Sequence, residues 1–217
     1  MADVVMVRHG QASFGAEDYD QLSPLGHQQA AWLGDYFLAH GMHFDRVVRG
    51  ALRRQRETAE GICNVMGIAG ATEDPRFDEF HYDPLQTEYL RETGADAPTD
   101  RTAFLRIFPD IFTKWELGHL KGSGEIYIDF RVRVDAALDA VIHAGSPTLI
   151  VTSGGVIGAV MRRVLDLSAR SAADLTLNIH NASIHCLNVE NNALRLSVFN
   201  ASPHLDPIDR AHARTYV

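Results

Sequence analysis

The sequence has few cysteines and no long hydrophobic run. Only two of its 217 residues are cysteines, Cys63 and Cys186, and they do not form a CxxC pair. This count speaks against a disulfide framework and against a thiolate zinc site. No apolar run approaches the roughly 20 residues that cross a bilayer. The first residues also lack the charged and long apolar segments of a secretory signal. We therefore expect a cytoplasmic protein with no membrane partner.

The chain is also short of positive charge. Twenty-eight acidic residues against twenty basic ones give a formal net charge of −8. Because polyanions are attracted by net positive charge, we expect no nucleic-acid partner, and any anion chemistry must be local. The GxxxxGK[ST], GxGxxG, GxSxG and HExxH motifs are missing too. A kinase, a dehydrogenase, a serine hydrolase and a metallohydrolase are therefore not supported, and we expect no metal and no cofactor.

What is present is an ordinary globular composition, with 46% hydrophobic and 22% charged residues. This length can bury a core without disulfides, and we expect one domain over residues 1–217. Strand and helix patterns alternate along it, which predicts an α/β fold. Between about 80 and 123 prolines and glycines break the periodicity, so we expect an inserted cap of short helical pieces.

Individual segments give the expected elements. Ser23 is a good N-cap with Pro24 at the first helical position, and Gly41 suits the helix end. Residues 124–143 fit both a strand and a helix, and their length favours the helix. The pair Asn191-Asn192 predicts a hairpin turn. Strands are expected at 4–7, 47–48, 149–151, 183–189 and 194–199, and a strand or extended segment at 72–78. Helices are expected at 24–40, 52–66, 124–143 and 156–166.

The sharpest local feature is Arg8-His9-Gly10, directly after the first expected strand. A histidine nucleophile needs a nearby cation and free backbone N–H groups to receive a phosphoryl group. Gly10 permits such a close backbone approach. A triplet of this kind also arises by chance in structural loops, but its position after a strand favours a functional site.

A second feature is the pair Arg53-Arg54 at the start of an expected helix, with Arg49 and Arg56 nearby. The planar guanidinium of arginine binds two phosphate oxygens at once. Helix geometry lets only one or two of these side chains reach a common site. We expect the others to lie on a solvated face.

Taken in order, four stretches resemble the histidine phosphatase superfamily, also called the phosphoglycerate mutase-like family. They are Val7-Arg8-His9-Gly10-Gln11, residues 22–30, residues 52–59 and Ser153-Gly154-Gly155. The resemblance runs over most of the chain and is weakest across 80–123. It implies a three-layer α/β/α sandwich with a mostly parallel central sheet, a small helical cap, and a metal-independent phosphatase.

The resemblance also implies roles for individual residues. His9 matches the histidine that is transiently phosphorylated, and Arg8 and Arg54 match its phosphate-binding arginines. Glu79 matches the general acid and base, a role that requires burial or a neighbouring phosphate to raise its pKa. From the residues alone, Asp78 and Asp83 are equally good acids. The expected substrate-binding residues are Gln11, Ser13, Gly154 and His204.

The chain departs from the family where a second histidine normally precedes the paired glycines, because Ser153 stands there. Ser153 could act as a weaker donor to the phosphoryl oxygens, which is the interpretation we favour. Another histidine could replace it in space, first His204 and then His81, His180 or His185. Alternatively, the protein could be a module that binds phosphorylated ligands with weak or no turnover.

The leading hypothesis is therefore a phosphatase that hydrolyses a small phosphate monoester through a phosphohistidine. The alternative is phosphoglycerate mutase-type phosphotransfer, which needs extra cations for a carboxylate, and none follows Glu79 until Arg91. Specificity is expected from the cap and the C-terminal loop. The candidate cations are Arg91, Arg101, Arg106 and Lys114. The apolar final strands are also compatible with a homodimer.

Overall fold

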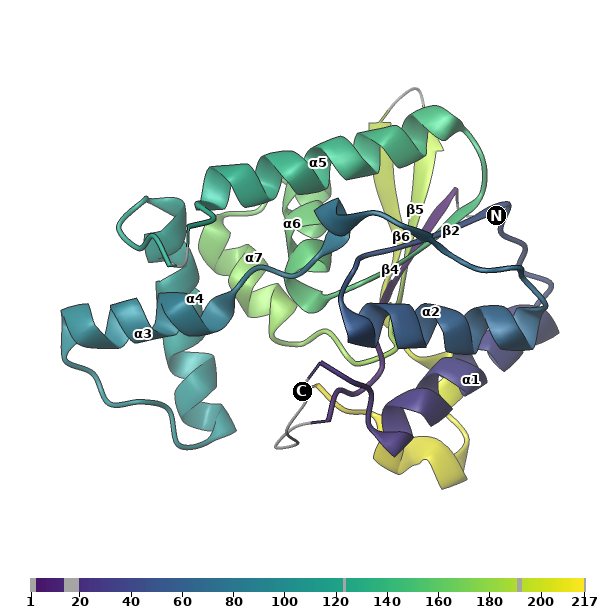
Figure 1. Ribbon diagram of the computed structural model, residues 1–217, viewed down its shortest axis with the longest axis horizontal. Helices are drawn as coiled ribbons and strands as arrows, with labels where there is room; N and C mark the ends of the chain where they lie inside the picture. The colour runs from purple at the N-terminus through teal and green to yellow at the C-terminus, as the bar shows by residue number, and fades with distance from the viewer. Residues whose placement is uncertain (1–2, 14–19, 123, 191–192, 217) are drawn as a thin grey trace.

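The computed structural model describes residues 3–13, 20–122, 124–190 and 193–216 (Figure 1). Its strands form one sheet in the order β3-β2-β4-β1-β5-β6. The first four of these pair in parallel, whereas β5 and β6 are antiparallel to their neighbours. The strands are β1 (Val4–Arg8), β2 (Arg46–Arg49), β3 (Thr72–Glu73), β4 (Thr148–Thr152), β5 (Ile184–Glu190) and β6 (Ala193–Ala201).

Helices cover both faces of this sheet, as Figure 1 shows. One face carries α1 and α2, and the other carries α5, α6 and α7. Two further helices, α3 and α4, extend to one side; we call residues 82–116 the α3–α4 segment. The helices are α1 (Pro24–Ala39), α2 (Arg53–Met66), α3 (Tyr82–Thr93), α4 (Arg101–Glu116), α5 (Tyr127–Ala144), α6 (Gly154–Leu165) and α7 (Ala169–Thr176). The predicted α/β fold with a mostly parallel central sheet is confirmed.

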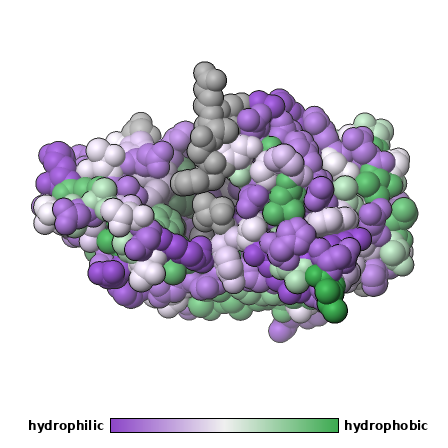
Figure 2. All heavy atoms as spheres, turned by 90° about the horizontal axis from the view of Figure 1, so that it is seen from below, coloured by the Kyte–Doolittle hydropathy of each residue, from purple (hydrophilic) through white to green (hydrophobic). Residues whose placement is uncertain are grey.

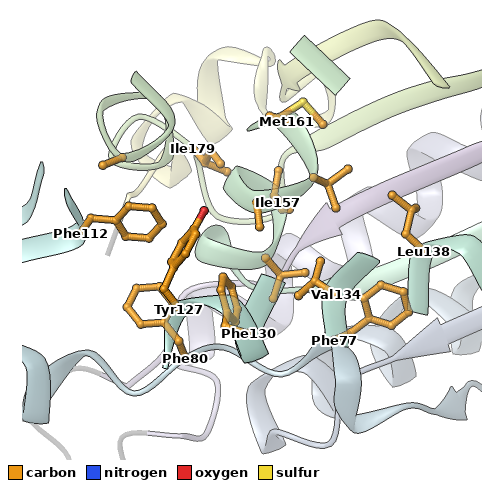
Figure 3. Packing of buried hydrophobic residues seen from close by; sticks show 14 of the residues in the cluster. Phe77, Phe80, Phe112, Tyr127, Phe130, Val134, Leu138, Ile157, Met161 and Ile179 are labelled. Carbon is orange, nitrogen blue, oxygen red and sulfur yellow. The ribbon is translucent and has the colours of Figure 1, made fainter. Parts of the chain in front are cut away.

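The central strands β1 and β4 are buried on both faces, which explains their unbroken apolar runs. Successive side chains of a strand point to opposite faces. In β1, Val4 and Met6 pack in the core under α5 and α6, whereas Val5 and Val7 pack under α1 and α2. Figure 3 shows the first of these cores, with Phe130, Val134 and Leu138 of α5 facing Ile157 and Met161 of α6. An apolar run, rather than an alternating one, is what such a strand requires.

Local signals placed two helices correctly. Ser23 Oγ accepts a hydrogen bond from Gly26 N at 3.0 Å, and Pro24 is the first residue of α1. The ambiguous stretch 124–143 is helical over Tyr127–Ala144. The expectation for 72–78 was wrong in part. Its strand ends at Glu73 because Pro75 begins a 3₁₀ turn, which runs from Pro75 to Phe77. The Asn191-Asn192 turn lies outside the described residues.

The region expected to hold short helical pieces contains two longer helices. Pro109 lies inside α4 instead of ending it, although an interior proline costs about 3 kcal/mol. Its neighbours Phe108, Ile111 and Phe112 are buried in the core, and each buried side chain of this kind contributes about 1.5–3 kcal/mol. Packing therefore outweighs the lost hydrogen bond. In the described parts of the chain, no helix is long and apolar enough to cross a membrane.

Candidate active site

The site lies where the carboxyl ends of β1 and β4 meet. These strands are parallel neighbours, with Arg8 opposite Thr152. The chain leaves β1 toward α1 on one face and leaves β4 into α6 on the other, which opens a crevice between them. His9 N donates to Thr152 O at 2.8 Å across this point. The topology thus brings the Arg8-His9 loop beside the start of α6.

The His9 imidazole is buried and held in one tautomer. Its Nδ1 lies 2.7 Å from the Gly10 carbonyl oxygen, which can only accept, so Nδ1 carries the proton. Nε2 keeps its lone pair and accepts a hydrogen bond from Arg54 Nε at 3.2 Å. Burial, with the Arg54 and Arg8 guanidiniums beside it, holds the pKa of His9 well below its usual range. His9 is therefore a neutral imidazole with a nucleophilic nitrogen.

Gly10 is required by close packing of the loop against α1. A Cβ at this position would lie 2.5 Å from the Gly26 carbonyl oxygen. Gly10 N donates to Thr58 Oγ1 at 3.0 Å, and that hydroxyl donates to Arg54 O at 2.7 Å. One threonine on α2 therefore fixes both the histidine loop and the turn that carries Arg54.

The two arginines reach the site from different elements. Arg8 ends β1, and its Nη1 donates to Ile179 O at 2.5 Å. Arg54 lies in the first turn of α2 and forms an ion pair with Asp20, at 2.5 Å between Nη1 and Oδ1. Arg53 instead pairs with Glu57 along the outside of α2, at 2.6 Å. As expected, one arginine of the pair points inward and the other does not.

Glu79 is held by the start of α6. Its Oε2 accepts from Gly155 N at 2.9 Å and its Oε1 from Phe80 N at 3.2 Å. Burial raises the pKa of Glu79, against the opposing effect of these hydrogen bonds and of the arginines. Phe80 anchors this loop among aromatic rings of α4 and α5; Figure 3 shows it beside Phe112 and Phe130. Glu79 is thus a carboxyl that keeps its proton to higher pH than usual.

These groups line one cavity of about 660 Å³. One end, which we call the phosphate end, is formed by Arg8, His9, Arg54, Glu79 and the Gly154-Gly155 turn. The rest is lined by the α3–α4 segment, the end of α7 and Tyr216. Part of the hollow is visible in Figure 2, between the α3–α4 segment and the remainder of the molecule. An imidazole, two guanidiniums and a carboxyl group therefore face one space.

Four residues predicted for the site do not line this cavity. Ser153 is fully buried, and its Oγ accepts from Gln55 Nε2 at 2.9 Å. Gln11 turns away and accepts from Ser23 Oγ at 2.8 Å. Ser13 pairs through its backbone N–H with Gln21 O at 2.8 Å. Of the four substrate-binding residues predicted, Gly154 alone lines the cavity.

His204, the fourth, lies outside the cavity lining. It lies in a 3₁₀ turn, Pro203–Leu205, that packs on α1, with its ring 6.4 Å from that of Tyr36. Burial, with two nearby arginines, lowers the pKa of His204 to about 4. His180 and His185 are not lining residues either, whereas His81 lies exposed at the cavity wall.

Among the other candidates, Arg101 lines the cavity, whereas Arg91, Arg106 and Lys114 do not. Of the two alternative acids, Asp78 accepts from Ala51 N at 2.6 Å outside the cavity, whereas Asp83 lies exposed at the cavity wall. The sequence analysis missed Asp20, Gln55 and Tyr216, because their partners lie far away in the chain. A local signal existed only for Thr58, one helical turn after Arg54.

In the described ranges, no three His, Cys, Asp or Glu side chains are grouped so that they could hold a metal ion.

Three comparisons place the chain among known proteins. The histidine phosphatase superfamily (branch 1) matches residues 4–202. A metal-independent phosphoserine phosphatase of Arabidopsis thaliana is 25% identical over 216 residues, covering 96% of this chain and 85% of that protein. The mitochondrial serine/threonine-protein phosphatase Pgam5 of Drosophila grimshawi is 28% identical over 198 residues, covering 86% of this chain and 58% of that protein.

Solved structures agree with these sequence relatives. The mycobacterial glucosyl-3-phosphoglycerate phosphatase, in its complex with inorganic phosphate, superposes with a TM-score of 0.69 at 25% identity. The match covers 95% of this chain and 100% of that one. The family match spans most of the chain and includes the loop with His9, the start of α2 and the start of α6. This chain belongs to the histidine phosphatase superfamily.

Proposed function

We propose that this protein hydrolyses phosphate monoesters of small molecules through a phosphohistidine on His9. The observation that carries the proposal is the convergence of His9, Arg8, Arg54 and Glu79 on one end of a single cavity. The pKa shifts run in the directions that the chemistry needs, because burial and the arginines lower the pKa of His9 and burial raises that of Glu79. The phosphatases among its relatives support the reaction class.

The first step transfers the phosphoryl group to the enzyme. The phosphate dianion binds between Arg8 and Arg54, which exchange hydrogen bonds within the protein for bonds to phosphate oxygens. His9 Nε2 attacks the phosphorus in line, an N–P bond forms, and the bond to the ester oxygen breaks. The Glu79 carboxyl gives its proton to that oxygen, so the leaving group departs as a neutral alcohol.

The second step returns the enzyme to its starting state. The Glu79 carboxylate accepts a proton from a water molecule while the water oxygen attacks the phosphohistidine. The N–P bond breaks, inorganic phosphate leaves, and Nε2 regains its lone pair. Arg8, Arg54 and the N-terminal N–H groups of α6 supply the positive charge in both steps, so we propose a mechanism that uses no metal and no cofactor.

Ser153 enters this proposal as a residue that stands in place of a second catalytic histidine and does not touch the phosphate. Its side chain is bonded to Gln55 behind the cavity wall. The charge that a histidine would supply falls to the two arginines and to the start of α6. We also propose that residues 80–123 are a cap inserted in one domain of residues 1–217, and that this cap holds the alcohol part of the substrate.

Hydrolysis is favoured over a mutase reaction by the distribution of cations. A mutase must keep the dephosphorylated acid bound while the phosphate returns to another oxygen. Among the lining residues that the structure describes, Arg101 is the single Arg or Lys beyond Arg8 and Arg54, and it is exposed. The dephosphorylated product is thus expected to leave, and water to complete the reaction.

The test is hydrolysis of p-nitrophenyl phosphate by the purified protein and by His9→Ala. We expect the variant to lose at least about 10³-fold in kcat. His43→Ala, which changes an exposed histidine far from the cavity, is the matched control and should keep full activity. Phosphate binding without turnover by the unaltered protein would favour the binding module, and equal activity of His9→Ala would contradict the proposal.

A further inference from the structure

The cavity continues well beyond the phosphate end, and this extension indicates the class of substrate. Resting on the proposed function, we infer that the preferred substrates are phosphate monoesters of bulky, uncharged, apolar alcohols. The residues that would hold the alcohol are Tyr82, Phe104, Phe108 and Leu177, which we call the aromatic wall.

The size of the cavity is the first step of the argument. A volume of about 660 Å³ lies in the range of pockets that enclose a whole small molecule. A phosphoryl group has only four heavy atoms, and its contacts are confined to Arg8, His9, Arg54 and the start of α6. Most of the cavity is therefore available to the alcohol.

The chemistry of the aromatic wall is the second step. The rings of Tyr82, Phe104 and Phe108 pack against one another, with centroids 5.3–5.4 Å apart. Leu177, at the end of α7, also lines the cavity. A charged group placed against Phe104, Phe108 and Leu177 would lose its hydration without gaining a partner, which is costly. The polar atom of the wall, the Tyr82 hydroxyl, is itself buried and has no hydrogen-bond partner among the described residues. An apolar group would instead be removed from water on several sides.

The placement of charge is the third step. Beyond the phosphate end, the charged lining residues in the described chain are Arg101 and Asp83, and both are exposed. The Arg101 guanidinium lies 4.4 Å from the centre of the Tyr216 ring and donates to Leu177 O at 3.3 Å. These two opposite charges are hydrated at the surface and give little advantage to a substrate carboxylate or ammonium. The interior of the extension favours an uncharged alcohol.

Three alkyl monoesters test this inference: ethyl phosphate, 2-phenylethyl phosphate and phosphoserine. None of them is an aryl ester, so an activated phenolate leaving group does not affect the comparison. All three release a primary alcohol, so the chemical step is similar and kcat/KM reports mainly on binding. Burial of a phenyl group predicts a kcat/KM for 2-phenylethyl phosphate roughly 10- to 100-fold above that for ethyl phosphate. Phosphoserine should be no better than ethyl phosphate.

Two variants on α4 locate the preference. Phe104→Ala should lower the ratio of kcat/KM for 2-phenylethyl phosphate over ethyl phosphate to below about threefold, and Phe104→Leu should retain part of it. The matched control is Arg106→Ala, which changes an exposed residue of α4 outside the cavity and should leave the ratio unchanged. If Phe104→Ala does not fold, the kcat/KM ratios of the unaltered protein and of Phe104→Leu still test whether the aromatic wall holds the phenyl group.

The outcomes separate this inference from the proposed function. Equal kcat/KM for the ethyl and phenylethyl esters, or a preference for phosphoserine, would overturn the apolar substrate class and leave the phosphatase standing. A phenylethyl preference that survives in Phe104→Ala would overturn the assignment to the aromatic wall. If none of the three esters is hydrolysed, both the proposed function and this inference are overturned.

Discussion

At the scale of single residues, burial moves the pKa values of His9 and Glu79 in opposite directions. Burial disfavours the charged form of each group, which lowers the pKa of the imidazole and raises that of the carboxyl. Neutral His9 and protonated Glu79 are therefore expected to coexist over a wider pH range than in water. Opposite shifts of this kind support the proposed roles of His9 as nucleophile and Glu79 as acid.

The pH profile of kcat/KM follows from these shifts. The acid limb reflects protonation of free His9, so it should lie below the usual range of a histidine. The alkaline limb reflects ionisation of Glu79, so it should lie above the usual range of a carboxyl. Glu79→Gln should lose the alkaline limb and reduce kcat for alkyl esters by about 10²–10⁴-fold. An acid limb at an ordinary histidine pKa would contradict the account of His9.

Ser153 and Gln55 form a second pair that can be tested as a unit. Both side chains are fully buried, so the larger imidazole in Ser153→His should overfill the site and cost about 1–3 kcal/mol. Gln55→Ala should make room, so that the double variant regains stability and exceeds the unaltered protein in kcat/KM. A double-mutant cycle is completed by measuring Tm and kcat/KM for the unaltered protein, both single variants and the double variant. A stable and faster Ser153→His alone would show that Gln55 does not occupy the space.

At the scale of elements, the first turn of α6 positions the Glu79 carboxyl. Gly155 leaves room that Glu79 and Phe80 fill, and a Cβ there would overlap both side chains. A Cβ on the neighbouring Gly154 would come no closer than 3.7 Å to another residue. Close packing therefore requires glycine at position 155 and does not require it at position 154.

Alanine substitutions at the two positions test this difference. Gly155→Ala should lower the stability by about 1–3 kcal/mol through overpacking. It should also lower kcat by about 10²-fold, because it displaces Glu79 from its reacting position. Gly154→Ala is the matched control for thermal unfolding and should leave Tm nearly unchanged. Equal Tm values for the two variants would show that α6 adjusts without moving Glu79.

Some elements could be predicted from local signals and others could not. The N-cap Ser23 and Pro24 placed α1, because capping depends on neighbouring residues. The helix α7 was missed, although Ser168 Oγ accepts from Ser171 N at 3.1 Å and offers a comparable cap. Pro109 was expected to break the helical pattern, but tertiary packing of α4 outweighs this local effect. Local chemistry predicts an element only where packing does not override it.

At the scale of the whole molecule, the cavity joins residues from the first strand to Tyr216 near the end of the chain. The position of His9 after the first strand pointed to this edge of the sheet, because loops after parallel strands meet there. Arg54 and Glu79 were assigned from the resemblance to the family. The sequence could not predict that Ser153 turns to Gln55, that His204 packs beside Tyr36, or that aromatic rings line the extension. These outcomes depend on contacts between distant segments. The homodimer stays a prediction, with β6 at one edge of the sheet.

The most direct test of the central claim is to trap the phosphorylated enzyme. The unaltered protein is mixed with a ³²P-labelled monoester, quenched within one turnover, and the labelled peptide is sequenced. We predict label on His9 that survives alkali and is lost in acid, as a phosphoramidate bond requires, and no label in His9→Ala. Turnover without label on His9, or label that persists in His9→Ala, would contradict the mechanism.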